Sequence, residues 1–305
     1  MHYYNSIRDL IGHTPLVKIN YAFEQVEGVN LFAKLEYYNP SGSVKDRTGL
    51  YMVEDAIKDG RLKRGSTIVE ATAGNTGLGV AFAALNQGFH VIFVVPEKFS
   101  EEKQILMKAL GADIIHTKRE DGMLGAAAKA QELLSEIKDS ISLQQFKNMS
   151  NPKAHYETTG PEIYQDLDGK IDYLVAGAGS GGTYSGVVKF LKEQNRNIKG
   201  ILADPVGSTM GGGEHADYDI EGIGNDFIAE TMDMSLVDKV IKINDTQAFD
   251  GARALARHEG ILGGSSTGAA FSAALKLIYE HHVKGNIVFI APDSGDRYFS
   301  KHLYA

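Results

Sequence analysis

The chain has 305 residues, of which 43% are hydrophobic and 23% charged, with a formal net charge of −8, 34 glycines and no cysteine. This length suits two α/β domains of ordinary size, and the acidic balance without a dense Lys/Arg cluster argues against nucleic acid as a partner. The lack of cysteine excludes disulfides and thiolate chemistry of the protein itself, no apolar run suits a membrane span, and the first residues lack the apolar core of a signal peptide, so a cytoplasmic protein is expected.

The first chemical candidate is a lysine at the start of a predicted helix. Two short strands, Leu16–Ile19 and Leu31–Leu35, precede a turn that leads into the amphipathic stretch Thr48–Asp59. With Ser43 as the N-cap, the helix begins before this stretch and Lys45 lies in its first turn. The positive end of the helix dipole disfavours an ammonium group, so we expect the pKa of Lys45 to be lowered, as a nucleophilic amine requires. The alternative is a solvated lysine paired with a neighbouring carboxylate, which this segment alone favours.

A turn rich in glycine and hydroxyl groups follows the next predicted strand. Residues 72–77 read Thr-Ala-Gly-Asn-Thr-Gly and precede a helix over Val80–Gln87. Their backbone N–H groups suit a carboxylate, and Asn75 adds an amide that can reach a hydroxyl or an oxyanion. Strands and helices alternate from here to residue 138, which predicts a parallel sheet whose ligands gather at the carboxyl ends of its strands.

The polar stretch Leu143–Pro152 marks the predicted transition between domains. We expect an amino-terminal α/β domain over residues 1–147 and a carboxyl-terminal α/β domain over residues 148–305, and the first strands can pack on the second domain. Gln145 either lines a site or bonds loop backbone, and composition alone favours the second interpretation.

A second turn of the same kind, Gly177–Thr183, connects an apolar strand to a predicted helix over Tyr184–Glu193. Its four glycines let backbone N–H groups converge on one point at a helix start, which predicts an anion site. The same residues satisfy Gly-x-Gly-x-x-Gly, with Asp204 at the end of the next strand, as in dinucleotide-binding proteins. A dinucleotide and a single phosphate both fit this turn.

A third turn, Gly260–Gly268, opens the predicted helix Ala269–His281. Ser265 within it can face a polar ligand atom or serve only as a helix cap. The chain between the second and third turns contains two loops, a strand over Lys239–Ile243 and a helix over Thr246–Glu259, and the last predicted strand is Asn286–Ile290.

Three such turns and one lysine indicate a phosphorylated coenzyme that carries an aldehyde. A nicotinamide dinucleotide would leave Lys45 without a role, whereas pyridoxal phosphate uses every feature. Its phosphate would lie on Gly179–Thr183, its aldehyde on Lys45, its ring hydroxyl near Asn75 and its pyridine nitrogen near Ser265. A serine hydroxyl leaves that nitrogen essentially unprotonated, which suits rapid loss of a leaving group from Cβ.

The motifs resemble, in order, those of the cysteine synthase and cystathionine β-synthase family, pyridoxal-phosphate enzymes of the tryptophan-synthase-β fold type. Asn39–Arg47 resembles the Schiff-base motif, Thr72–Gly77 the substrate-carboxylate loop and Gly179–Thr183 the phosphate loop. The resemblance implies two α/β domains, each a mostly parallel twisted sheet covered by helices, with the coenzyme in the cleft between them. The implied site residues are Lys45 for catalysis; Lys45, Asn75, Gly179, Ser180, Gly181, Gly182, Thr183 and Ser265 for the coenzyme; and Thr72, Ala73, Gly74, Asn75, Thr76, Gln145 and Gly222 for the substrate.

Within the family, Glu221–Ile228 and Gly260–Ser265 are more like cystathionine β-synthases, and bacterial members that use O-acetylserine also resemble the chain at Ala73, where many members have serine. The implied reaction joins O-acetylserine, or serine, to homocysteine through an enzyme-bound α-aminoacrylate and gives cystathionine. A cysteine synthase that uses sulfide is the alternative, and an NAD-binding dehydrogenase and a non-catalytic binding protein are more remote ones. We expect small-molecule substrates and a homodimer, and neither a metal, a nucleic acid nor a membrane as partner.

Overall fold

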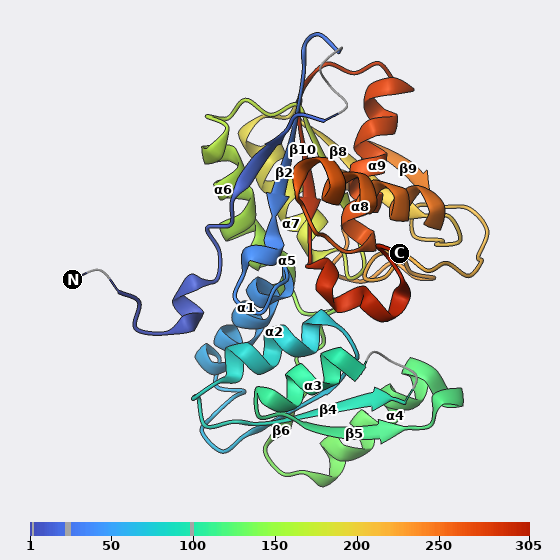
Figure 1. Ribbon diagram of the computed structural model, residues 1–305. Helices are drawn as coiled ribbons and strands as arrows, with labels where there is room; N and C mark the ends of the chain where they lie inside the picture. The colour runs from blue at the N-terminus through green and yellow to red at the C-terminus, as the bar shows by residue number, and fades with distance from the viewer. Residues whose placement is uncertain (2, 22–25, 98–100) are drawn as a thin grey trace. The chain divides into compact units, whose positions relative to one another are not determined.

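The computed structural model describes residues 1, 3–21, 26–97 and 101–305, which divide into two compact units (Figure 1). The first unit contains Met1–Ile11 and Lys45–Asn151, and the second contains Gly12–Val44 and Pro152–Ala305. The two strands near the amino terminus, within Gly12–Val44, therefore belong to the unit that also contains the carboxyl-terminal half of the chain.

The first unit is built on a parallel sheet of four strands in the order β5-β4-β3-β6. These strands are β3 (Thr67–Ala71), β4 (His90–Pro96), β5 (Asp113–Thr117) and β6 (Ser140–Ile141). The helices of this unit are α1 (Lys45–Lys58), α2 (Asn75–Ala84), α3 (Glu101–Ala109) and α4 (Gly122–Glu136), with short 3-10 turns η1 (Ile7–Leu10) and η3 (Arg119–Asp121).

Alternating side chains of these strands pack on opposite faces of the sheet. Ile68 and Phe93 belong to a buried apolar cluster with residues of α1 and α2, such as Met52 and Leu78. Their sequence neighbours Val69 and Val94 belong to another cluster, with alanines and leucines of α4. Helices therefore cover both faces, as the apolar strands of a parallel sheet require.

The second unit contains a sheet of six strands in the order β1-β2-β10-β7-β8-β9. The strands are β1 (Leu16–Ile19), β2 (Val29–Leu35), β7 (Tyr173–Gly177), β8 (Lys199–Pro205), β9 (Lys239–Ile243) and β10 (Gly285–Ala291). β1 pairs antiparallel with β2, and every other pairing is parallel. The helical segments are η2 (Glu36–Tyr38), α5 (Ser150–Ala154, which begins in the first unit), the π-helix η4 (His155–Thr159), α6 (Gly160–Asp166), α7 (Gly182–Gln194), η5 (Met234–Leu236), α8 (Asp245–Glu259), α9 (Ser265–Tyr279) and η6 (Gly295–Lys301).

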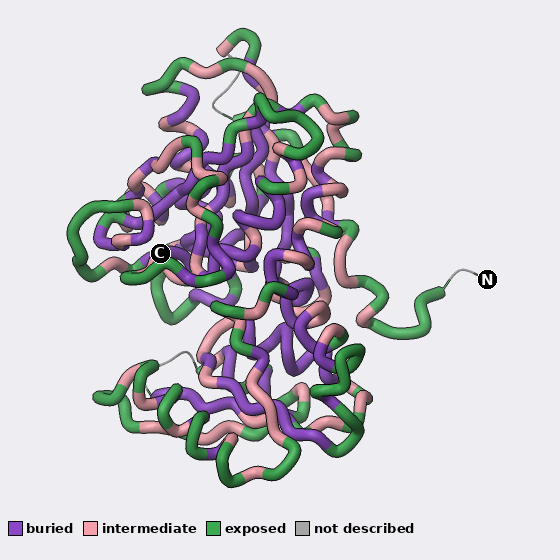
Figure 2. The backbone as a smooth tube through the Cα atoms, turned by 180° about the vertical axis from the view of Figure 1, so that it is seen from behind, coloured by how far each residue is buried: buried purple, intermediate pink, exposed green. Residues whose placement is uncertain are grey.

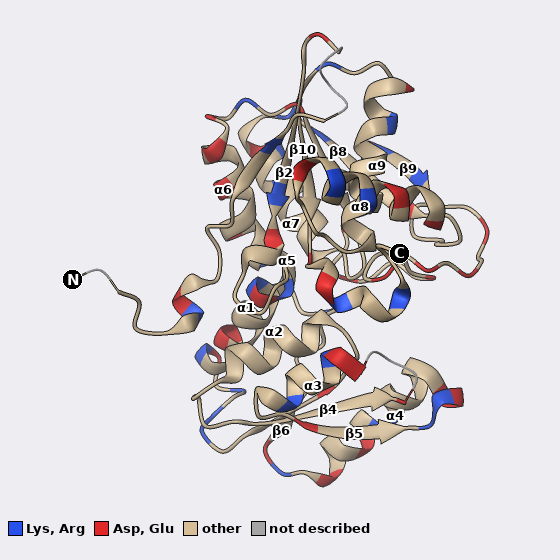
Figure 3. Ribbon diagram, in the orientation of Figure 1, with Lys and Arg blue, Asp and Glu red and all other residues tan. Residues whose placement is uncertain are grey.

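The larger sheet is also covered on both faces. Ile287 and Phe289 of β10 pack with α8 and α9, which lie side by side in Figure 1, whereas Val288 and Ile290 pack with α6 and α7. Figure 2 shows the backbone in the middle of the larger unit as largely buried, and Figure 3 shows β10 without charged residues. The predicted α/β class, with mostly parallel sheets covered by helices, is confirmed.

Among the residues that the structure describes, no helix is both long and apolar enough to cross a membrane.

Candidate functional site

Lys45 is the first residue of α1 and is half-buried. Two glycines bring the backbone of its helix into direct contact with α2: a Cβ at Gly79 would lie 2.2 Å from the Lys45 carbonyl oxygen, and a Cβ at Gly49 would lie 2.3 Å from the Gly79 carbonyl carbon. Gly79 is one helical turn after Asn75, the first residue of α2. The lysine backbone therefore lies about one turn from the start of α2.

The predicted carboxylate turn connects β3 to α2. Gly74 is the N-cap of α2 with extended backbone (φ −122°), no side chain caps the helix, and no acidic residue lies in its first turn. Thr76 Oγ1 donates a hydrogen bond to Gln145 Oε1 at 2.6 Å, and Ala73 packs against the apolar cluster of the first unit. The helix start has the backbone donors and the positive dipole end that a carboxylate needs.

Glu70 of β3 holds the segment that carries Gln145. Its Oε1 accepts hydrogen bonds from Ser142 Oγ at 3.0 Å, from the Gln144 N–H at 3.2 Å and from the Leu143 N–H. Burial raises the pKa of Glu70 above its usual value, although these three hydrogen bonds act in the opposite direction. No motif in the sequence predicted a role for this acid, although a carboxylate within a buried strand is a signal that could have identified it.

Asn151 is a second residue that no sequence motif indicated. It is fully buried, its Nδ2 donates to the Gln145 carbonyl at 2.9 Å, and its Oδ1 accepts from Thr48 Oγ1 at 3.1 Å. Since Thr48 is in the first turn of α1, one side chain connects the helix of Lys45 to the backbone of Gln145.

In the second unit, the glycine turn between β7 and α7 is oriented by hydrogen bonds. The carbonyls of Ala178, Gly179 and Ser180 accept from the Gly224 N–H at 2.8 Å, from Asn225 Nδ2 at 2.6 Å and from Thr231 Oγ1 at 2.6 Å. In a trans peptide the next N–H points opposite to the carbonyl. The N–H groups of residues 179–181 therefore point away from the segment 224–231, to the side where an anion could accept from them.

Close packing requires glycine at two positions of this turn. A Cβ at Gly179 would lie 2.5 Å from the Gly222 carbonyl oxygen, and Gly181 has φ +82° with Met232 Cβ 2.4 Å from the place of a Cβ. Gly181 is also the N-cap of α7, which has neither a side-chain cap nor an acidic residue in its first turn. The turn thus fits an anion at a helix start.

Ser265 is the first residue of α9, whose N-cap is Gly264 and which has no side-chain cap. Its Oγ is part of a buried side chain and accepts a hydrogen bond from the Glu221 N–H at 3.0 Å. A hydroxyl that accepts in this way keeps its own proton for another acceptor. This bond also connects Ser265 to the loop of Gly222, a residue with φ +83° and no atom within 4 Å of where a Cβ would be.

The predicted site residues thus form one group in each unit. Lys45, the Thr72–Thr76 turn and Gln145 come together in the first unit. In the second unit, the Gly179–Thr183 turn contacts Gly222, whose neighbour Glu221 bonds Ser265.

Asp204, which a dinucleotide site would use for a ribose, is 1% exposed. Its carboxylate accepts from Lys242 Nζ and from the Gly211 N–H at 3.0 Å, so it holds the glycine loop after β8. This bonding gives no support to a dinucleotide.

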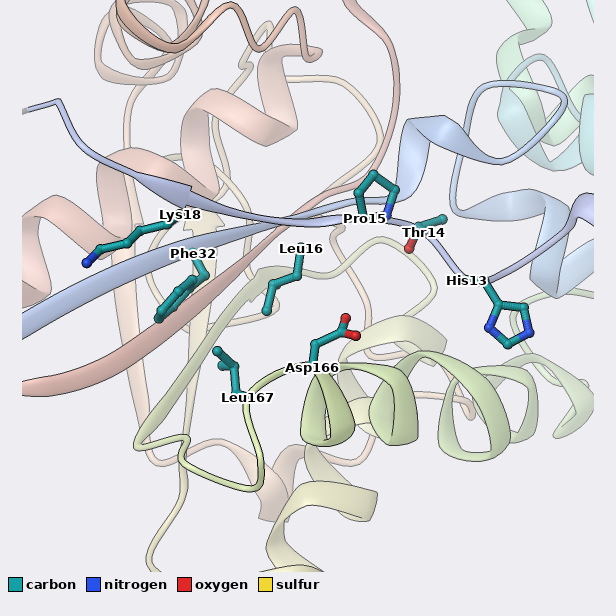
Figure 4. A pocket seen from close by; sticks show the side chains of 8 residues that line it. All are labelled: His13, Thr14, Pro15, Leu16, Lys18, Phe32, Asp166 and Leu167. Atoms are coloured by element: carbon teal, nitrogen blue, oxygen red, sulfur yellow. The ribbon is translucent and has the colours of Figure 1, made fainter.

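Figure 4 shows a pocket of the second unit that lies outside these groups. It is lined by His13, Thr14, Pro15, Leu16, Lys18, Phe32, Asp166 and Leu167. None of the predicted site residues lines it, and we assign it no part in the chemistry.

Comparison with known proteins relates the whole chain to one family of enzymes. A family model described as "Pyridoxal-phosphate dependent enzyme" matches residues 7–293. The chain is 50% identical over 298 residues to the O-acetylserine dependent cystathionine beta-synthase of Bacillus subtilis (strain 168), covering 98% of this chain and 97% of that protein. It is 43% identical over 303 residues to a cysteine synthase of Helicobacter pylori (strain J99), covering 98% and 99%. The crystal structure of an O-acetylserine dependent cystathionine beta-synthase from Helicobacter pylori matches with a TM-score of 0.93 and 42% identity over 100% of both chains.

Proposed function

Because the chain belongs to the family of pyridoxal-phosphate-dependent enzymes, we propose that it joins O-acetylserine to homocysteine and releases cystathionine and acetate. Serine, with water as the leaving group, is the alternative donor. Support for this choice of reaction comes from the 50% identity to the Bacillus subtilis enzyme whose name states it.

The residues of the two units fit this coenzyme. The first unit contains the amine of Lys45 at the start of α1. The second contains the Gly179–Thr183 turn, whose N–H groups point away from the segment 224–231 that bonds the carbonyls of residues 178–180. We assign the phosphate to Gly179–Thr183, the aldehyde to Lys45, the ring hydroxyl to Asn75 and the pyridine nitrogen to Ser265. The oriented peptides of the glycine turn are the observation that carries this assignment, since a phosphate needs several convergent donors.

Lys45 carries the proton transfers in this proposal. Bound pyridoxal phosphate supplies an aldehyde for the amino group and a ring that withdraws electrons from the substrate Cα. The Lys45 amine would take the proton from the substrate Cα as acetate leaves Cβ. After the thiolate sulfur has bonded to Cβ, Lys45 Nζ returns the proton to Cα. Its place at the positive end of α1 favours the neutral amine that this role requires.

The substrate carboxylate lies, in this proposal, against the start of α2. The residues that hold it are Thr72, Ala73, Gly74, Asn75, Thr76 and Gln145, and Gly222 contributes from the second unit. The Thr76 hydroxyl occupies the amide oxygen of Gln145. The Gln145 NH₂ group is then directed elsewhere and can donate to the carboxylate. An uncapped helix start supplies further donors.

Ser265 sets the electronic state of the ring. Because its oxygen already accepts from the Glu221 N–H, its proton can be donated to a pyridine nitrogen that carries none. An unprotonated nitrogen makes the ring a weaker electron acceptor, which favours prompt loss of acetate over slower carbanion reactions such as transamination.

The acceptor is tested by competition between thiols. Purified enzyme with saturating O-acetylserine is given homocysteine, sulfide or both, and the products are identified by mass spectrometry. We expect cystathionine to be the main product when both are present. Formation of cysteine from sulfide, without cystathionine, would instead establish the cysteine synthase alternative. The similarity to the Helicobacter pylori cysteine synthase supports that alternative.

We also propose a two-fold homodimer in the cytoplasm, where a thiol substrate stays reduced. Sedimentation equilibrium should give twice the chain mass of 33.1 kDa, and cell fractionation should recover the protein with other cytoplasmic enzymes.

A further inference from the structure

A fully buried histidine connects the π-helix η4 to the glycine turn of the second unit. His155 is 0% exposed, its Nδ1 lies 2.9 Å from Thr159 Oγ1, and its Nε2 lies 3.2 Å from Thr183 Oγ1. The reaction proposed above does not use this side chain. Because π-turns within helices are frequent at functional sites, the contact between His155 and Thr183 indicates a functional role for the histidine.

The packing of α7 on the π-helix brings these groups together. A Cβ at Gly186 of α7 would lie 2.2 Å from the Pro152 carbonyl oxygen of α5, and 2.8 Å from His155 Cβ and 2.9 Å from Tyr156 N of the π-helix that continues it. Main-chain atoms cannot move aside, so the two helices approach this closely only with glycine at position 186. The imidazole is thereby held within hydrogen-bond distance of the first turn of α7.

The proton positions follow from what a phosphate can accept. A phosphate offers only acceptor oxygens, so the Thr183 hydroxyl must donate its proton to bind one. Its oxygen must then accept from His155, which requires a proton on Nε2. A neutral imidazole has one donor and one acceptor nitrogen, so Nδ1 accepts the proton of the Thr159 hydroxyl. Thr159 then donates to His155, His155 donates to Thr183, and Thr183 donates to the phosphate.

We propose that His155 is a positioning residue for the coenzyme phosphate: it donates from Nε2 to Thr183 Oγ1 and so directs the Thr183 hydroxyl proton to the phosphate. Thr159 fixes the required tautomer from the other side of the ring. This inference rests on the proposed role of the Gly179–Thr183 turn, and it adds two residues from the π-helix to the phosphate site.

The test measures coenzyme binding to the apoprotein, separately from turnover. Dissociation constants are determined for pyridoxal phosphate and for pyridoxal, which lacks the phosphate. In His155→Asn, which is too short to reach Thr183, pyridoxal phosphate should bind roughly 10- to 100-fold more weakly, as expected when a hydrogen bond to a charged group is lost. Pyridoxal binding should not change. His155→Gln, which places an amide near the position of Nε2, should restore part of the loss.

A double-mutant cycle distinguishes this role from general support of the fold. Thr183→Val should weaken pyridoxal phosphate binding as much as His155→Asn does, and the double variant should be no weaker than Thr183→Val alone. Tyr156→Phe is the matched control in the same π-helix, because its hydroxyl bonds the exposed Glu193 at 2.6 Å. It should leave both constants unchanged.

Equal loss of pyridoxal and pyridoxal phosphate in His155→Asn, or additive losses in the double variant, would overturn the inference. If His155→Asn does not fold, Thr159→Val keeps the side-chain volume and should weaken only pyridoxal phosphate, by a smaller factor; an unchanged constant would then count against the role of His155. If the wild-type protein binds pyridoxal as tightly as pyridoxal phosphate, the phosphate assignment of the turn fails, whatever His155 does.

Discussion

Lys45 is the single side chain on which the proposed chemistry depends. Lys45→Ala removes both the attachment of the coenzyme and the base that moves the Cα proton. We expect turnover to fall roughly 10³-fold or more, and the visible absorbance of the bound coenzyme to change. Lys58→Ala, at the exposed last turn of the same helix, is the control and should match the wild type. Turnover within a few-fold of wild type in Lys45→Ala would remove the lysine from the mechanism.

The hydroxyl of Thr76 has a narrower role, because it orients the amide of Gln145. In Thr76→Val the amide can rotate, and its NH₂ group is no longer held toward the substrate carboxylate. We expect the KM for O-acetylserine to rise roughly 3- to 10-fold with little change in kcat. Thr76→Ser keeps the hydroxyl and should resemble the wild type. A kcat that falls while KM is unchanged would show that Thr76 acts elsewhere in the reaction.

At the scale of elements, the contact between α1 and α2 determines where the lysine lies. In Gly79→Ala the new Cβ would meet the Lys45 carbonyl oxygen, which is main chain and cannot yield as a side chain can. We expect the free energy of unfolding to fall by about 1–3 kcal/mol or more, as measured by urea denaturation of the apoprotein.

Gly74→Ala is the matched control for this substitution, since its backbone is extended and no atom lies within 4 Å of the added Cβ. Its stability should be unchanged or slightly higher. Equal stability of Gly79→Ala and wild type would mean that the two helices can separate without cost.

The helices that follow the three glycine turns begin earlier than the sequence predicted. α2 begins at Asn75, where the pattern predicted Val80, and α9 begins at Ser265, where the pattern predicted Ala269. Glycine, serine, threonine and asparagine have low helix propensity, which favoured a loop. Tertiary packing decides otherwise: in α9, a Cβ at Gly268 would lie 1.9 Å from the Ala248 carbonyl oxygen of α8.

The sequence predicted the motifs of the candidate site but not the residues that hold them. Glycines and hydroxyls in a row form a local pattern, and a helix start after them gives that pattern a physical meaning. Glu70, Asn151 and His155 act through partners far along the chain, such as Thr48 for Asn151. No local periodicity shows such contacts, so only the folded structure could identify them.

For the whole molecule, the feature hardest to predict was which chain segments make up each unit. Asn30 and Asn286 lie on the paired strands β2 and β10 and are 256 residues apart in sequence. Local patterns give the strands but not such pairings. The expected domain boundary at residue 147 stays a prediction. The roles assigned to individual site residues stay a proposal.

Glu70 makes the stability of the whole fold depend on pH. Burial raises its pKa in the folded state above the unperturbed 4.5. Its contribution to stability is therefore complete below about pH 4.5 and is lost as the pH rises through the folded value. Glu70→Gln can keep an oxygen for the three donors but does not titrate. The unfolding free energy of the wild type minus that of Glu70→Gln should fall as the pH rises above 4.5, and a difference that grows with pH would contradict the assignment.

In the proposed function, one amine, that of Lys45, bonds a coenzyme whose phosphate rests on the Gly179–Thr183 turn. The most direct measurement is borohydride reduction of the purified enzyme with pyridoxal phosphate, followed by digestion and peptide mass spectrometry. Reduction converts a lysine–aldehyde bond into a stable amine. We predict the phosphopyridoxyl mass on the peptide that contains Lys45 and on no other lysine, whereas a label on a different lysine, or none, would contradict the account.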